Sequence, residues 1–381
     1  MGRLLAWQTR RVREGSDHRR MPDFRHGMAV LMGASRISGA RACPWARLGA
    51  WLSALMLAAL FGLLAITPAN AGQSVAYGAY GPEGPRLREQ LWIVPGGDPN
   101  RYLRATVFRP ADPPGSVAPV RRPLVVINHG TSDWTRMAVS MPVFYWLSRW
   151  FVDRGYAVVL PQRRGHGATG GPLSEAVGTC AEPDHFASGQ VAADDVVAVV
   201  EYMSRQPFVQ PSQTVVVGVS TGGWASLALA SRNPANVRAV VNFAGGRGGH
   251  ADGEANAICG RSELIQAAGA FGASARIPTI WFYAKNDSYF SPELAKQMAG
   301  AYRDHGGVAD LHLLPAYSDD GHDIVDDRAG WDLWGPALAQ FLGVEREPQS
   351  VAGGTGRHPS VPAPLATTVS ATGDGDTAPT Q

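Results

Sequence analysis

Cysteine is scarce in this chain: its 381 residues include only Cys43, Cys180 and Cys259. None of them forms a Cys-x-x-Cys pair, and no His-x-x-x-His spacing is found elsewhere, so the sequence predicts no metal site. Internal repeats are also lacking. The chain is therefore interpreted as one domain flanked by an N-terminal and a C-terminal segment, and not as an array of repeated modules.

A surplus of basic charge is lacking once the N-terminus is set aside. The whole chain has a formal net charge of +2, but residues 1–71 hold ten arginines and only three acidic residues. The remainder carries 24 basic and 29 acidic residues. Such a chain has no positive field to attract nucleic acid or an anionic membrane surface, and we expect neither as a stable partner.

Residues 1–71 have the pattern of a leader and secretory signal peptide. An Arg-rich region precedes the nearly uninterrupted apolar run 48–66, and Ala69-Asn70-Ala71 follows it. This pattern predicts cleavage after Ala71 and a periplasmic or secreted protein. An uncleaved membrane anchor at residues 48–66 is the alternative, because the run is almost long enough to span a bilayer.

Export changes the expectation for the cysteines. Cys43 leaves with the leader, so Cys180 and Cys259 remain as a pair in an oxidising compartment, where we expect them to form a disulfide. The other end of the chain, residues 346–381, is rich in Pro, Gly, Ser, Thr and Ala. It cannot bury enough apolar surface to offset its ordering entropy and is expected to be a disordered tail.

Between these ends, residues 72–345 alternate strand-like and helical segments. The strand-like runs are continuously apolar, which is typical of strands buried on both faces of a parallel sheet. Strands are expected at residues 91–94, 103–108, 124–128, 157–160, 214–219, 239–243, 279–283 and 311–314, the first two as an antiparallel pair. Helices are expected at residues 143–153, 191–205, 221–232, 292–305 and 331–342. The order predicts an α/β domain with a mostly parallel eight-stranded sheet flanked by helices.

The interval 245–276 is longer than the other connections and is rich in Gly and Ala. It predicts a small cap over the pocket, with a long surface excursion carrying one helix at residues 262–270 as the alternative. His250 lies in this interval, where it either points into the pocket or lies on the surface.

The most informative motif is Gly218-Val219-Ser220-Thr221-Gly222, which joins a β-branched run to an Ala/Leu-rich helical stretch. A serine at the apex of a strand-to-helix turn takes a strained conformation that only small neighbours permit. The turn exposes the hydroxyl, and the Thr221 amide at the start of the helix is placed to bind an oxyanion. Ser220 is therefore the predicted nucleophile.

A serine nucleophile needs a base and an orienting carboxylate, and in this type of fold they follow in the order acid, then histidine. Asp287 follows the strand at 279–283, and His322 follows the last strand. Asp319, Asp320 and Asp323 compete for the acid role but are expected to be solvated loop carboxylates. Asp287 as a turn or helix cap and His322 as a plain loop histidine are the alternatives.

The second oxyanion donor is expected in His129-Gly130-Thr131, after the strand at 124–128, as the amide of Gly130 or Thr131. His129 is also conceivable as a base, although its place favours ordering of the loop. Three aromatic residues near these segments are candidates for lining an apolar substrate pocket, which hints at an ester with a hydrophobic part. They are Trp134, Tyr289 and Phe290.

These residues resemble the α/β-hydrolase superfamily from about residue 91 to residue 342. Within it, Gly218-Val219-Ser220-Thr221-Gly222-Gly223-Trp224, Asn286-Asp287-Ser288-Tyr289-Phe290 and Asp319-Asp320-Gly321-His322 look like the dienelactone hydrolase-like branch. The nucleophile departs from the cysteine of the enzymes that name that branch. The resemblance implies the α/β-hydrolase fold and a carboxylic ester hydrolase that works without a cofactor, on a small-molecule ester, through an acyl-enzyme.

Two other functions share parts of this pattern. A serine peptidase of the prolyl-oligopeptidase type has the same strand-to-helix turn at the serine, called the nucleophile elbow. Its catalytic triad also follows the order serine, acid, histidine. A non-catalytic envelope binding protein on a hydrolase scaffold belongs to a different class. An exported serine esterase is the function that the sequence favours.

Overall fold

A computed structural model describes residues 76–131, 136–138 and 141–344. The expected leader, the possible anchor at 48–66, the C-terminal tail and Trp134 lie outside the described residues. No helix in the described ranges is long and apolar enough to cross a membrane.

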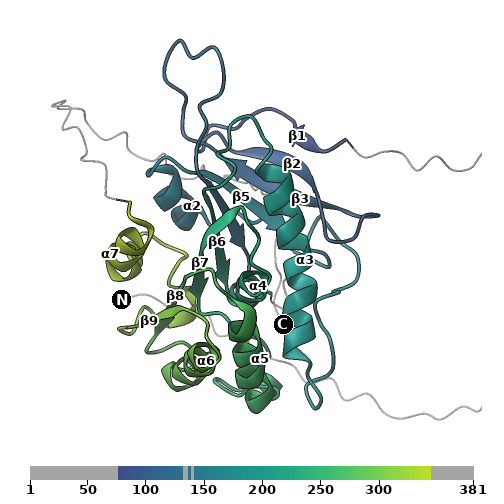
Figure 1. Cartoon of the computed structure of the whole chain (residues 1–381), viewed down its shortest axis with the longest axis vertical. Coiled ribbons are helices and arrows are strands. Elements are labelled where there is room, and N and C mark those ends of the chain that lie inside the picture. The colour runs from purple at the N-terminus through teal and green to yellow at the C-terminus, as the bar shows by residue number, and fades with distance from the viewer. Residues whose placement is uncertain (1–75, 132–135, 139–140, 345–381) are drawn as a thin grey trace, which may run out of the picture. The chain divides into compact units, whose positions relative to one another are not determined.

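The central element is a mostly parallel sheet, as predicted, but it has nine strands where eight were expected (Figure 1). Its order is β1-β2-β3-β5-β4-β6-β7-β8-β9. Strands β1 to β3 and β5 pair antiparallel in succession, and β5-β4-β6-β7-β8-β9 run parallel. The strands are β1 Gly78–Tyr80, β2 Gln90–Pro95, β3 Tyr102–Phe108, β4 Leu124–Asn128, β5 Ala157–Gln162, β6 Thr214–Val219, β7 Val237–Phe243, β8 Thr279–Ala284 and β9 Ala309–Leu314.

The additional strand is β1, at one edge of the sheet. It has three residues, pairs only with β2, and leaves Ala79 and Tyr80 exposed. Because a short, exposed strand has no run of apolar residues, neither periodicity nor burial distinguishes Gly78–Tyr80 from a loop in the sequence.

Helices cover both faces of the sheet, which explains the continuous apolar runs. Successive residues of β4 point to opposite faces: Val126 packs in the cluster under α3, α4, α5 and α6, and Val125 in the cluster under α2 and α7. The helices are α2 Tyr145–Val152, α3 His185–Met203, α4 Thr221–Ala230, α5 Arg261–Ser274, α6 Pro292–Asp304 and α7 Trp331–Leu342. All five expected helices and the helix of the 245–276 interval are present.

The interval 245–276 does not form the predicted cap. Its helix α5 buries Leu264, Ala268 and Phe271 in the same cluster as α3, α4 and α6, so it is a layer helix of the sheet. No residue of 245–276 lines the cavity described below. The interval is therefore the alternative, a long excursion with one α-helix, because the apolar side of α5 packs on the sheet layer.

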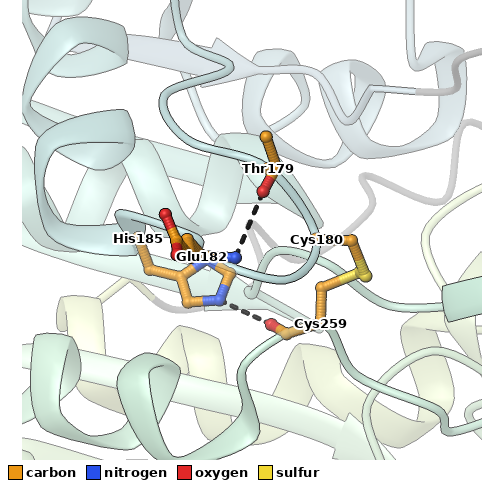
Figure 2. Close-up of a disulfide and its surroundings, with 5 residues drawn as sticks. All are labelled: Thr179, Cys180, Glu182, His185 and Cys259. Atoms are coloured by element: carbon orange, nitrogen blue, oxygen red, sulfur yellow. Dashed lines mark hydrogen bonds between the residues drawn. A yellow bond between two sulfur atoms is a disulfide. The ribbon is translucent and has the colours of Figure 1, made fainter.

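Cys180 and Cys259 form the predicted disulfide (Figure 2). Cys180 lies in the loop before α3, and Cys259 lies just before α5. Beside the bridge, His185 Nε2 donates to the carbonyl of Cys259 at 2.8 Å, and the Glu182 amide donates to Thr179 Oγ1 at 3.2 Å. The disulfide therefore ties the 245–260 segment to the start of α3.

Removal of this disulfide is expected to lower stability without abolishing the fold. The bridge closes a loop with a sequence separation of 79 residues, worth on the order of 4 kcal/mol in the chain-entropy model, which strain usually reduces. We expect a Cys180→Ser/Cys259→Ser variant to unfold at lower urea concentration than the oxidised parent. The parent under reducing conditions serves as the matched reference. Two freely titrating thiols in the native parent would contradict the bridge.

Candidate active site

Ser220 lies at a sharp turn between β6 and α4, in a conformation that is rare for a residue with a side chain (φ 56°, ψ −126°). The turn closes because its glycines leave room: a Cβ on Gly218 would lie 2.1 Å from the carbonyl oxygen of Gly222. A Cβ on Gly222 would lie 2.2 Å from the carbonyl oxygen of Asn128, at the end of β4. The elbow motif therefore describes a close approach of backbone to backbone.

Hydrogen bonds hold the strained serine in place. The Ser220 amide donates to the carbonyl of Phe243 at 3.0 Å, and the Ser220 carbonyl accepts from Trp224 at 3.1 Å and from Gly246 at 3.3 Å. These bonds connect the turn to the end of β7 and to the loop that follows it. Ser220 is 8% exposed and lines the cavity described below.

Asp287 and His322 come together although 35 residues separate them. His322 lies in the short 3-10 helix Gly321–Asp323 after β9, and its Nδ1 is 3.1 and 3.2 Å from the two carboxylate oxygens of Asp287. Asp287 is 2% exposed and also accepts from the amides of Tyr289 at 2.8 Å and Phe290 at 2.9 Å. With the Nδ1 proton directed at Asp287, Nε2 is the free nitrogen of a neutral His322 ring. His322 and Ser220 line the same cavity.

The competing carboxylates have other positions. Asp320 accepts from the amides of Ser288 at 3.0 Å and His322 at 2.9 Å, and from the Ser288 hydroxyl, so it closes the loop around His322. Asp323 lines the cavity without bonding the imidazole, and Asp319 is exposed. Among the described carboxylates, Asp287 alone bonds the His322 ring.

The expected oxyanion residues lie next to Ser220. A Cβ on Gly130 would lie 3.0 Å from Ser220 Cβ and 3.5 Å from its Oγ, so a side chain at this position would crowd the serine. Thr221 is the first residue of α4, where the amide has no acceptor within the helix. The Thr131 and Thr221 hydroxyls are 2.8 Å apart, which connects the loop after β4 to the helix N-terminus.

A buried ion pair connects the loop after β4 to the first residue of α4. The sequence contains no motif for this pair. Arg163 donates to both oxygens of Glu175 at 2.7 and 3.0 Å, with both side chains 2% exposed or less. Arg163 also donates to Thr221 Oγ1 at 3.3 Å and to the carbonyl of His129 at 2.7 Å, and Glu175 accepts from Thr131 at 3.1 Å. Burial raises the pKa of Glu175, but Arg163 and Arg247 outweigh this effect and hold it below its ordinary value.

Neither histidine near the oxyanion residues has a free nitrogen for base catalysis. His129 Nε2 accepts from the Arg163 amide at 3.1 Å, and its Nδ1 donates to the carbonyl of Gly130 at 2.7 Å. Burial and the charge of Arg163 lower the His129 pKa well below its ordinary value. His166 bonds Thr131 Oγ1 at 2.9 Å and the carbonyls of Arg163 and Arg164. Both rings therefore order the loop.

The cavity over Ser220 has a volume of about 690 Å³. Its lining includes Tyr289, as predicted, and the apolar and aromatic segment 141–146. Phe290 is a correction: it is 1% exposed, lies outside the cavity lining and packs in the core beside His322, with ring centroids 5.8 Å apart. Two adjacent aromatic residues in a loop carry no sequence signal that shows which of them faces the cavity. Segment 141–146 was not anticipated, since no motif marks it.

The sheet order and the strained serine after β6 are those of the α/β-hydrolase fold, which the resemblance implied. With a histidine–carboxylate pair at the same cavity, its class is that of a serine hydrolase. The model of the prolyl oligopeptidase family matches residues 142–246, a segment that contains the elbow but neither Asp287 nor His322. No curated protein sequence matches the chain.

Several solved structures are similar at low identity. Porphyromonas gingivalis dipeptidyl peptidase 4 is 15% identical over 67% of this chain and 35% of that one, with a TM-score of 0.47. A putative dienelactone hydrolase from Klebsiella pneumoniae is 16% identical over 71% of this chain and 99% of that one, with a TM-score of 0.44. A cold-adapted esterase from an Arctic intertidal metagenomic library is 14% identical over 70% and 99%, with a TM-score of 0.47. The chain thus spans about a third of the first of these proteins and nearly all of the other two.

A Glu175→Gln variant is expected to lose about 3–5 kcal/mol of unfolding free energy at pH 7, because it leaves Arg163 buried without a countercharge. The lowered pKa of Glu175 means that its contribution is present above the ordinary value of 4.5 and declines as the pH falls below it. Urea unfolding of the variant and the parent from pH 8 to pH 4 measures this difference. Glu182→Gln, at an exposed carboxylate, is the matched control. A loss below about 1 kcal/mol would show that the pair does not support the loops.

Proposed function

We propose that this protein is an exported serine esterase in which Ser220, His322 and Asp287 form the catalytic triad. The observation that supports this most directly is the convergence of a strained, accessible Ser220 and a His322–Asp287 pair on one cavity. Export and a periplasmic or secreted location rest on the signal-like pattern of residues 1–71.

In the proposed reaction, His322 Nε2 takes the Ser220 proton while Oγ attacks the ester carbonyl. The amide of Thr221 and that of Gly130 or Thr131 donate to the tetrahedral oxyanion, and Asp287 stabilises the imidazolium. The imidazolium protonates the leaving alkoxide, which departs as the alcohol and leaves an acyl-enzyme. His322 then takes a proton from water as the water oxygen attacks the acyl carbonyl. The imidazolium returns that proton to Ser220 Oγ as the carboxylic acid leaves. The chain's own residues supply every proton transfer in this scheme, and the proposed enzyme uses no cofactor.

The composition of the cavity favours an ester with a hydrophobic part. Residues 141–146 present Met141, Pro142 and the aromatic run Phe144-Tyr145-Trp146 to the space above Ser220, and Tyr289 closes another side. An acyl or aryl group on these surfaces would be removed from water close to the reacting serine. The loosely matched dienelactone hydrolase-like branch is compatible with such a small-molecule substrate.

The match of residues 142–246 to the prolyl oligopeptidase family favours a peptidase as the second candidate. A panel of p-nitrophenyl esters set against aminoacyl-p-nitroanilides separates the two. We expect turnover of the esters, with the anilides at least a hundredfold slower. The reverse order of rates would move the assignment to a peptidase.

Substitution of either Ser220 or His322 is expected to abolish turnover. Ser220→Ala and His322→Ala should each lower ester kcat by about four to six orders of magnitude, because the triad members act as a unit. Initial rates with p-nitrophenyl esters and labelling by a fluorophosphonate probe measure the loss. A parent protein that neither labels nor hydrolyses would indicate a non-catalytic binding protein. Ser220→Ala activity within about tenfold of the parent would place the nucleophile elsewhere.

Asp287→Asn should lower kcat by about ten-thousandfold, because an amide favours the wrong imidazole tautomer and does not stabilise the imidazolium. Asp319→Asn, at an exposed carboxylate of the same loop as His322, is the control and should stay close to the parent. Asp320→Asn should cost less than Asp287→Asn, because Asp320 bonds the backbone and Ser288. A larger loss at Asp319 or Asp320 would reassign the acid.

A further inference from the structure

The imidazole of His322 is one end of a stack of three rings that come from three separate loops. The Tyr289 ring lies over it, with centroids 4.2 Å apart and planes 29° apart. The His250 ring lies against Tyr289, with centroids 3.8 Å apart and planes 13° apart. His250 does not line the cavity, so its contact with the site passes through Tyr289.

A second connection joins His250 to the backbone of His322. His250 Nε2 is 2.8 Å from Ser288 Oγ, and the Ser288 hydroxyl donates to Asp320. Because the single hydroxyl proton is directed at the carboxylate, the Ser288 oxygen accepts from His250, whose Nε2 therefore carries a proton. Asp320 in turn accepts from the His322 amide at 2.9 Å. Stacking on one side and hydrogen bonds on the other thus close a ring of contacts around His322.

The segment that carries His250 is braced from outside the site. His250 takes a left-handed conformation (φ 59°), and the Cys259 amide donates to the carbonyl of Gly248 at 2.8 Å. The Asn256 amide donates to the carbonyl of Ser288 at 2.7 Å, beside the stack. Cys259 is bonded to Cys180 before α3 (Figure 2). The position of His250 is thereby set by the disulfide-linked excursion, which does not itself reach the cavity.

The His322–Asp287 bond leaves one motion of the imidazole uncontrolled. It anchors the ring at Nδ1, but the ring can still swing about that point and carry Nε2 away from Ser220. A flat ring stacked on its face opposes this motion, and displacements of about 1 Å at a reacting atom cost on the order of a hundredfold in rate.

We propose that His250 is a positioning residue for the reaction: by stacking on Tyr289, it holds the Tyr289 ring against His322 and so keeps Nε2 in line with Ser220. This inference rests on the proposed triad. It assigns a catalytic purpose to the 245–260 segment, which precedes the sheet-layer helix α5.

The test replaces His250 and leaves every cavity residue intact. His250→Ala removes both the stack and the Ser288 bond, and should lower kcat with a p-nitrophenyl ester by about tenfold to a hundredfold with KM within about twofold. His250→Phe restores a flat ring without the donor and should recover kcat to within about threefold of the parent. His250→Gln supplies a donor without the ring and should stay as low as His250→Ala. His312→Ala, which removes a ring contact with Phe282 outside the cavity, is the matched control and should keep the parent's kcat.

A readout that does not need turnover separates this inference from the proposed function. The Nδ1 proton of His322 should give a slowly exchanging NMR signal in the parent, His250→Phe and His312→Ala, and a broadened or lost signal in His250→Ala. An inactive parent that shows this pattern would refute the esterase and keep the positioning role. An unchanged signal, a His250→Ala kcat within twofold of the parent, a KM effect alone, or no recovery with phenylalanine would each overturn the positioning role.

Discussion

The close packing of the first turn of α4 against the end of β4 is the constraint on which the rest of the site depends. Gly222 touches the carbonyls of Asn128 and His129 with no room for a Cβ, and this contact forces Ser220 into its positive φ. The same contact brings Gly130 beside the Ser220 side chain. One steric requirement therefore places both Ser220 and the neighbouring backbone of Gly130 at the cavity.

The conformation is costly, and the surrounding structure compensates for it. A strained residue of this kind costs on the order of 1–3 kcal/mol and persists only where its neighbours over-determine it. Hydrogen bonds of the Ser220 backbone to Phe243, Trp224 and Gly246 hold the residue in this conformation. The buried Arg163–Glu175 pair contacts Thr131 and Thr221 on either side of it. Burying that pair is itself unfavourable unless its hydrogen bonds are complete, and Thr131, Thr221 and the His129 carbonyl complete them.

The loops that make the site all leave the same edge of the sheet. In a parallel sheet, the carboxyl ends of the strands share one edge, so segments distant in the chain meet there. The loops after β4, β6, β8 and β9 carry Gly130, Ser220, Asp287 and His322 respectively. The excursion after β7 adds His250, and the disulfide to Cys180 connects this excursion to the chain after β5. The disulfide and the excursion after β7 are in this way connected to the His322 imidazole through ring contacts and hydrogen bonds.

The sequence by itself determined the local features: the buried strands, five of the six helices, the glycines around Ser220 and the order serine, acid, histidine along the chain. These depend on periodicity and on residues whose conformational limits are intrinsic, such as Gly218 and Gly222. Only the tertiary structure decided the rest, because it depends on contacts between distant segments. The three-residue edge strand β1 exists through its pairing with β2, α5 joined the sheet layer because its apolar side found α3 and α6, and Tyr289 rather than Phe290 faces the cavity. No local pattern encodes the Arg163–Glu175 pair or the His250–Tyr289–His322 stack, because their members lie on separate segments and come into contact only in the folded structure.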